Sequence, residues 1–355
     1  MSMISVFFAS IDKEWDEEIS IYTFDVYHFS GWINSSTEVD KGSPQGIVAV
    51  YKKKKFFLPI IKRVIDDEYW DAISPYGYGG PVIDTSLSNY EIDMILEEIK
   101  IFLYEEGCVS LFIRLNPILN KEWCSSIGTS VTHGLTLMCD LSKSEEEHWE
   151  ETQKQHRRGI MKSLNNNVVA KIEDFTEERI TVFSSIYKET MTKVGATDYY
   201  FFDDSYLHKL SKSIQNRLIL VTAYKNDNAI ASSLFTICKE SGIMHFYLGG
   251  TLNEYRNLQP SKLITHIARG WGREEGYKAL HFGGGLGCNS DSLYKYKKGF
   301  SSEELEFKTW RLIINLEKYK NLVIANNRLA EAEAEAEAEL ESGFFPSYRY
   351  TPVKV

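Results

Sequence analysis

The 355-residue sequence lacks the features that mark several large classes of protein. Its five cysteines are scattered and form no CxxC pair, which argues against a disulfide framework and a structural zinc site. No apolar run approaches the roughly 20 residues needed to span a bilayer. The net charge of -10 argues against a general polyanion-binding protein, although a local basic groove is compatible with it.

The sequence also lacks the short motifs of several enzyme classes. It contains no Walker loop, no HExxH, no GxSxG and no Cys/His set with metal-ligand spacing. The triplet Gly283–Gly285 follows a predicted strand but opens no convincing helix, so we reject a dinucleotide-binding fold. The N-terminal stretch MSMISVFFASIDKEWDEE has no basic start, and we do not expect a signal peptide. Dispersed cysteines favour a reducing, cytoplasmic location.

What is present is a mixed α/β pattern of two-domain length, with 43% hydrophobic and 13% aromatic residues. We predict a first domain over residues 1–143, a second over 144–320 and a C-terminal segment over 321–355. A strand hairpin is expected around the four lysines at 52–55, and a helix over Tyr90–Gly107. In the C-terminal segment, Ala330–Glu339 is predicted to be a solvated spacer. Gly343–Arg349 is predicted to dock back on the body.

Several stretches resemble, in order, the motifs of the FemAB-like transferases, a branch of the GNAT acyltransferase superfamily. These stretches are SPYGYGGP (74–81), LFIRLNP (111–117), HRRGIMKSL (156–164), YKETMTKVGATDYY (187–200), HFYLGG (245–250), HFGGG (281–285), SLYKYKKGF (292–300) and FFPSYR (344–349). The resemblance implies two tandem GNAT-like domains, each with a mixed central sheet flanked by helices. It also implies an acyl or aminoacyl transfer near the second domain.

The loop before the helix predicted over Pro260–Glu275 departs from the usual GNAT pattern. GNAT domains bind the CoA pyrophosphate on backbone N–H groups of an Arg/Gln-x-x-Gly-x-Gly/Ala loop. Here Arg256 fits the first position, but Gln259 and Ser261 replace the small residues, and Pro260 removes a donor. We therefore expect no tightly bound cofactor and a donor that is either aminoacyl-tRNA or an acyl-CoA held in an altered way. A loop that merely begins a helix is the alternative.

Two residues are the candidate catalytic groups. Lys297 matches the lysine of the family's Phe-Lys motif, with Tyr296 in place of Phe. A fixed ammonium in a partly dry site can stabilise the negative charge that develops on the acyl oxygen. Tyr247, on the predicted central strand, is a candidate for moving a proton, and core packing is the alternative. Lys295 and Lys298 are expected to be solvated.

Five further residues are candidates for substrate binding, besides Arg256. Arg158 and Lys162 share a helix face and suit a phosphate, whether of a nucleotide- or lipid-linked precursor or of a tRNA 3′ end. Simple solvation of that face is the alternative. In the first domain, Tyr76 and Tyr78 suit stacking on a sugar or base, and simple packing of their loop is the alternative. Arg114 belongs either to a structural ion pair or to the acceptor site.

The sequence thus predicts a cytoplasmic acyl- or aminoacyltransferase that acts on an amine of a cell-envelope precursor, either a peptidoglycan peptide or an amino sugar of a surface polysaccharide. The acceptor class depends on the resemblance alone. The alternatives are an acyl-CoA-dependent N-acyltransferase of a nucleotide sugar and a non-catalytic protein that binds a glycan or peptide precursor. The sequence leaves the oligomeric state open.

Overall fold

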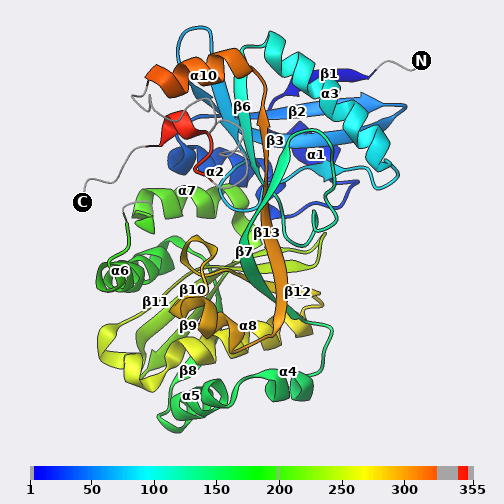
Figure 1. The fold of residues 1–355 in the computed structure, drawn as a ribbon. Coiled ribbons are helices and arrows are strands. Elements are labelled where there is room, and N and C mark those ends of the chain that lie inside the picture. The colour runs from blue at the N-terminus through cyan, green and yellow to red at the C-terminus, as the bar shows by residue number, and fades with distance from the viewer. Residues whose placement is uncertain (1–3, 198–199, 326–342, 351–355) are drawn as a thin grey trace. The chain divides into compact units, whose positions relative to one another are not determined.

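The computed structural model describes residues 4–197, 200–325 and 343–350, and it confirms a mixed α/β architecture (Figure 1). The chain forms two compact units, the first from residues 1–133 and 306–355 and the second from residues 134–305. Strands β7 (Thr129–Asp140) and β13 (Glu303–Ile313) each contribute to both units. For this reason the units divide before the domain limits suggested by the sequence, residues 143 and 320, which stay predictions.

The first unit contains a mixed sheet in the order β1-β2-β3-β4-β6-β13, with β5 paired to β3. Its strands β4 and β6 are parallel. The strands that lie wholly in this unit are β1 (Ser5–Ala9), β2 (Ser43–Tyr51), β3 (Lys54–Val64), β4 (Trp70–Ile73), β5 (Val82–Ile83) and β6 (Cys108–Arg114). Its α-helices are α1 (Lys13–Ile19), α2 (Ser30–Asp40), α3 (Asn89–Glu105) and α10 (Leu316–Ala325).

Helix α3 shows why this unit folds as the sequence pattern suggests. It begins at a capping box in which Ser88 and Glu91 satisfy each other's backbone amides. Its buried residues recur at helical spacing and pack on the sheet: Ile92, Ile95, Leu96, Ile99 and Leu103. Each such side chain stabilises the fold by about 1.5–3 kcal/mol when fully buried. The β2–β3 hairpin is also confirmed, with Lys52 and Lys53 at positive φ in its two-residue turn.

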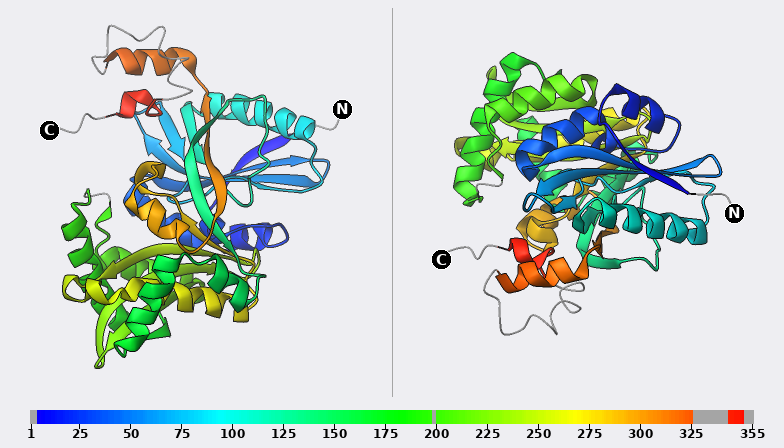
Figure 2. Two further views of the ribbon diagram at one scale, coloured as in Figure 1. Left: turned by 60° about the horizontal axis from the view of Figure 1, so that its bottom comes forward. Right: turned by 90° about the horizontal axis from the view of Figure 1, so that it is seen from above.

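The C-terminal residues 343–350 dock on the first unit, as predicted. Phe345 and Tyr348 are buried against α10, and the short helix η6 (Ser347–Arg349) lies beside α10 (Figure 2). Tyr348 Oη donates to Asp71 Oδ2 at 2.9 Å, and Arg349 Nε bonds to the same oxygen at 2.6 Å. Asp71 is fully buried, so this docking is fixed by charged hydrogen bonds as well as by apolar packing. The predicted spacer at Ala330–Glu339 lies outside the described residues.

The strands of the second unit follow the order β7-β12-β11-β10-β9-β8 and are also mixed in direction. Strands β11 and β12 are parallel. The strands that lie wholly in this unit are β8 (Val169–Asp174), β9 (Leu218–Lys225), β10 (Asn228–Cys238), β11 (Ile243–Thr251) and β12 (Ala279–Gly283). Its α-helices are α4 (Glu145–Glu151), α5 (Lys154–Asn165), α6 (Glu177–Val194), α7 (Asp204–Ile214), α8 (Pro260–Glu274) and α9 (Ser292–Lys298).

Helices α6 and α8 both pack on strand β11 of this sheet. Gly272 of α8 fits against the side chain of Met244, where a Cβ atom would lie 2.4 Å from the sulfur. Gly250, later in β11, lies against the backbone of α6 at Ile186. Helix α5 packs on α8, so the basic helix predicted from HRRGIMKSL is anchored to the body through its other face. This arrangement places α5, α8 and α9 around one end of the central strands.

Candidate active site

The central strands of the second unit separate soon after they pair. The parallel ladder between β11 and β12 contains three residue pairs and ends at His245–His281. On β11, Leu248 pairs with Leu234 and Phe246 with Phe235, so Tyr247 is the extra residue of a β-bulge. The β12–β7 ladder also shifts register, between His281 and Gly283. Bulges of this kind turn side chains out of the regular alternation and are common beside active sites.

Two buried histidines, which the sequence reasoning missed, mark the point where the strands part. His245 Nδ1 and His281 Nδ1 lie 3.2 Å apart, and each residue is 1% exposed. One ring nitrogen must donate and the other accept, so the two imidazoles share one proton at this contact. The sequence carries a signal for the pair, because HFYLGG and HFGGG both begin with His-Phe.

Lys297 lies at the end of α9 and reaches the loop that follows β12. Its Nζ donates to the carbonyl oxygen of Gly284 at 2.5 Å, and the residue is 9% exposed. It forms no ion pair with any residue that the structure describes. Burial lowers the pKa of Lys297 to about 8, and the charges of Asp291 and Cys288 offset this only in part. The first predicted catalytic residue is therefore a buried ammonium with spare N–H donors.

Tyr247, the second predicted catalytic residue, lies on the other strand that borders the opening. Its hydroxyl lies 2.6 Å from the hydroxyl of Tyr206 on α7, and its ring lies 6.0 Å from that of Phe202. Tyr247 is half-buried. The β-bulge gives the side chain its direction, which strand alternation alone could not predict. Two adjacent hydroxyls can exchange a proton, so the geometry is compatible with the predicted role.

The start of α8 offers few free backbone donors. Pro260 has no N–H, and the amides of Gln259 and Lys262 already bond to the carbonyls of Arg256 and Gln259, each at 3.1 Å. Gln259 adopts a left-handed conformation, with φ of 62°. Arg256 itself is exposed. The loop therefore differs from a cradle of free amides, as the substitution of its small residues suggests.

A buried lysine at this helix start was also missed by the sequence reasoning. Lys262 is 7% exposed, and among the described residues its side chain makes neither a hydrogen bond nor an ion pair. Burial lowers its pKa. Gly159 of α5 leaves room for it, because a Cβ atom there would lie 2.6 Å from Lys262 Cδ. The positive end of the α8 dipole and the uncompensated ammonium of Lys262 thus lie together. Both features favour the binding of an anion at this place.

Tyr296 connects this helix start to the segment that carries Lys297. Its hydroxyl lies 3.2 Å from Thr265 Oγ1 on α8, and its carbonyl oxygen lies 2.8 Å from His156 Nε2 on α5. Burial, followed by the charge of Lys262, lowers the pKa of His156 to about 4. His156 is therefore a neutral donor through Nε2 at physiological pH, and it holds α5 against α9. Lys262 and Lys297 lie on elements that this contact chain fixes to each other.

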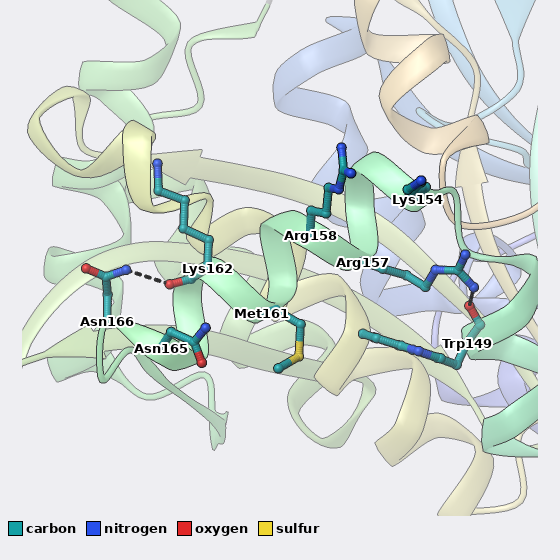
Figure 3. A pocket seen from close by; sticks show the side chains of 8 residues that line it. All are labelled: Trp149, Lys154, Arg157, Arg158, Met161, Lys162, Asn165 and Asn166. Carbon is teal, nitrogen blue, oxygen red and sulfur yellow. Dashed lines mark hydrogen bonds between the residues drawn. The ribbon is translucent and has the colours of Figure 1, made fainter.

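Arg158 and Lys162 lie together on the solvent side of α5, along a groove of about 510 Å³ (Figure 3). The side chain of Arg157 turns aside and donates to the carbonyl oxygen of Trp149 at 3.1 Å, as predicted. The buried face of the same helix holds His156, which contacts Tyr296. Arg158 and Lys162 are therefore on a different face of α5 from the one that contacts the Lys297 segment.

The three first-unit candidates are brought together by one loop, residues 74–81, which the body holds rigidly. The anchoring hydrogen bonds are Arg114 Nη1 to Ser74 O at 2.9 Å, Trp32 Nε1 to Tyr76 O at 2.8 Å, His28 Nε2 to Gly80 O at 2.9 Å and Asn120 Nδ2 to Pro81 O at 3.0 Å. Tyr76 and Tyr78 are half-buried on this loop. The ring of Tyr78 packs edge-on against that of Tyr27, 5.5 Å away.

Arg114 makes contacts of the structural kind, one of the two roles that the sequence suggested for it. Its Nη2 lies 3.9 Å from Asp40 Oδ1, and its guanidinium lies over the Phe112 ring at 5.4 Å. Burial raises the pKa of Asp40, and the charge of Arg114 opposes that rise. The arginine therefore compensates a buried carboxylate and fixes the tyrosine loop at the same time.

The described residues include neither a metal-binding cluster nor a membrane-spanning helix. No cluster of histidine, cysteine, aspartate or glutamate side chains among them is arranged to hold a metal ion. Within the same residues, none of the helices combines the length and the apolar character needed to cross a membrane.

Comparison with known proteins agrees with this geometry. Residues 152–298 match the model of a family described as "Acetyltransferase (GNAT) domain". The fold is similar to the crystal structure of FemX, with a TM-score of 0.68, 13% identity and coverage of 89% of this chain and 99% of that one. No curated protein sequence matches the chain.

Two further solved structures share the fold. The structure of L-PGS from Bacillus licheniformis has a TM-score of 0.55 and 12% identity, covering 86% of this chain and 92% of that one. The C-terminal domain of a putative lysylphosphatidylglycerol synthetase from Agrobacterium fabrum has a TM-score of 0.54 and 10% identity, covering 94% and 97%. At these identities the likeness concerns the fold.

The second unit therefore carries a GNAT acetyltransferase domain, and the protein is a transferase. The chain as a whole has a fold similar to that of FemX, and this likeness of fold agrees with the predicted resemblance to the FemAB-like branch of the GNAT superfamily.

Proposed function

We propose that the protein transfers an activated acyl or aminoacyl group to an amine of a cell-envelope precursor, in the cytoplasm. The acceptor would be a peptidoglycan peptide or an amino sugar, carried on a nucleotide or a lipid. The observation that carries this proposal is the buried ammonium of Lys297, held by the Gly284 carbonyl after β12 and forming no ion pair with a carboxylate of the described residues. A GNAT-type domain and a FemX-like fold are the context that supports it.

In the proposed reaction the acceptor amine attacks the carbonyl carbon of a thioester or ester donor, and no covalent enzyme intermediate is needed. The C–S or C–O bond of the donor then breaks, the new amide bond remains, and the donor leaves as a thiol or hydroxyl that takes up a proton in place of the one given up by the amine. Negative charge collects on the carbonyl oxygen. One Lys297 N–H is engaged by Gly284, and the other two are available to stabilise that oxygen in a site with little water. The amine nitrogen loses its proton to solvent, to the substrate, or through the Tyr247–Tyr206 hydroxyl pair.

Donor binding is proposed to use the start of α8. Lys262 supplies an ammonium where Pro260 and the engaged amides of the loop supply few backbone donors. Phosphate groups are common to CoA and to the 3′ end of aminoacyl-tRNA, so this site accommodates either class. Arg256, exposed beside it, is proposed to assist. Tyr76, Tyr78 and Arg114 are proposed to recognise the acceptor.

One alternative has a specific observation in its favour. The matched family is described as an acetyltransferase domain, which favours an acyl-CoA donor; the acceptor in this alternative would be a nucleotide sugar. Titration of acetyl-CoA and of charged tRNA, each followed by the melting temperature, separates the two donors. A ligand that binds only the native state must raise that temperature. A shift with CoA alone would exclude the aminoacyl-tRNA donor.

The test of the proposed chemistry is Lys297→Ala, with Lys295→Ala as the matched control. Both lysines lie on α9, but Lys295 is exposed. We expect about a 100- to 1000-fold loss of transfer for Lys297→Ala, the usual cost of losing one oxyanion donor, and little loss for the control. Equal transfer rates for the two variants would reject the role of Lys297.

A further inference from the structure

Helix α5 presents an unusual surface for a chain of net charge -10. Its sequence, KQHRRGIMKSLN, contains no acidic residue. Lys154, Arg158 and Lys162 recur every four residues, so they form one row about 12 Å long on the exposed side. None of the three forms an ion pair with a described residue. A row of uncompensated cations is thus displayed to solvent.

Apolar side chains lie beside this row. Met161 is 44% exposed and Leu164 is 45% exposed. Figure 3 shows Met161 directed away from the Arg158 and Lys162 heads, and the half-buried Trp149 lines the same groove. The residues that line the groove here include no carboxylate. The surface therefore combines a cationic row with an apolar edge.

We propose that this face of α5 docks on an anionic membrane surface. Lys154, Arg158 and Lys162 would bind headgroup phosphates, and Met161, Leu164 and Trp149 would enter the boundary between headgroups and acyl chains. A basic row beside leucine, methionine and tryptophan is the pattern of helices that lie in a bilayer interface. Charge complementarity selects the partner, because anionic lipids attract basic segments. The inference goes beyond the proposed transfer and is independent of the chemistry at Lys297.

The same features make single-stranded nucleic acid a poorer partner. Such strands are held by several aromatic side chains on which successive bases stack. This surface offers one aromatic residue, Trp149, whose ring already packs at 5.5 Å against His266. Exposed aliphatic side chains have no comparable role with bases, whereas a bilayer interface buries them. The buried side of α5, anchored on α8, leaves the exposed side free to dock without unfolding.

The test is sedimentation of the full chain with vesicles of phosphatidylcholine, alone and mixed with phosphatidylglycerol. We expect binding to the anionic vesicles only, and weaker binding at high salt. Arg158→Gln/Lys162→Gln should lower the partition coefficient about 10- to 30-fold, from about fivefold per basic residue. Lys52→Gln/Lys53→Gln, at the exposed hairpin tip, changes net charge equally and should bind within about twofold of wild type.

A second variant isolates the apolar contribution. Met161→Gln/Leu164→Gln should lower binding at least about fivefold and leave the dependence on salt unchanged. All four substituted positions on α5 are exposed, so unaltered melting temperatures serve as the check on folding. Equal binding to neutral and anionic vesicles, or equal losses in the α5 and hairpin variants, would overturn the proposal. So would binding of a single-stranded oligoribonucleotide in place of vesicles, or a dimer that depends on Met161 and Leu164.

Discussion

The two units differ in the cation that contacts the end of their parallel strand pair: it has a carboxylate partner in the first unit and none among the described residues in the second. Each contains a parallel strand pair, β4–β6 in the first and β11–β12 in the second. In each, a cationic side chain donates to a carbonyl just after one of these strands: Arg114 to Ser74 and Lys297 to Gly284. Arg114 has a carboxylate partner in Asp40, whereas Lys297 has none among the described residues.

This difference separates structural charge from functional charge. A cation that is paired with a buried carboxylate holds elements together, as the half-buried Arg63 and Arg349 do around Asp71. A buried cation without a partner costs stability, since the desolvation of its charge is not offset. Lys262 and Lys297 are buried cations without an ion-pair partner among the described residues. Lys297 contacts the loop just after β12, and Lys262 lies in the first turn of α8, the helix that follows β11. A fold retains such groups where a substrate supplies the missing negative charge.

The largest effect on stability is expected from Asp71→Asn in the first unit. The substitution leaves Arg63 and Arg349 without their shared carboxylate, and removing one partner of a buried ion pair costs about 3–5 kcal/mol. Denaturant unfolding measures the loss. Asp66→Asn, which breaks the exposed pair with Lys318, is the control and should change little. Equal effects of the two substitutions would show that the buried position of Asp71 adds nothing to the strength of its ion pairs.

The pH dependence of stability should identify Lys297. Its pKa in the folded chain is about 8, against 10.5 for a lysine exposed to water, so the unfolded chain binds the extra proton between these values. The free energy of unfolding should therefore rise by up to about 3 kcal/mol from pH 8 to pH 10.5, and Lys297→Met should remove that rise. Transfer should fall about tenfold per pH unit above pH 8, as the ammonium is lost.

The Lys262→Met variant tests the role of the buried, unpaired ammonium at the start of α8. Removing an uncompensated buried charge should raise the free energy of unfolding by about 1 kcal/mol or more. Affinity for the phosphate-bearing donor should fall about 10- to 100-fold, the equivalent of one charge-assisted hydrogen bond. Thermal melting with and without donor measures both. A destabilised variant with unchanged donor affinity would show that Lys262 has a structural role instead.

The smallest effect is expected for Arg114→Met, about 1–2 kcal/mol of unfolding free energy. It removes the bond to the Ser74 carbonyl and leaves Asp40 without its cation. Because burial raises the pKa of Asp40, the carboxyl can take up a proton, and the loss should shrink as the pH falls. Arg114→Lys keeps the charge and should lose less. A loss that is independent of pH would assign the effect to the Ser74 bond alone.

Much of this layout could be predicted from the sequence, because local signals and burial agree. The capping box of α3, the lysine turn of the β2–β3 hairpin and Pro260 at the first turn of α8 each specify an element within a few residues. The docking of FFPSYR followed from its aromatics and its arginine. The catalytic candidate Lys297 came from the resemblance and Tyr247 from its place on the predicted central strand, and both lie on elements that border the point where the strands part.

Other features depend on contacts distant in sequence. The burial of Lys262 requires the space left by Gly159, about a hundred residues earlier, and a lysine in a first helical turn is otherwise expected in solvent. The direction of Tyr247 follows from a bulge, which shifts strand alternation. Helix α2, SGWINSSTEVD, carries a weak apolar pattern and is held by tertiary bonds such as that of Trp32 Nε1 to Tyr76 O.

The central claim is that Lys297 is kept buried for function at a cost in stability, and Lys297→Met tests it most directly. Methionine has a similar length and no charge. The account predicts a higher free energy of unfolding than wild type below pH 8, together with a loss of transfer of at least about 100-fold. A variant that is less stable than wild type and transfers at an unchanged rate would contradict it.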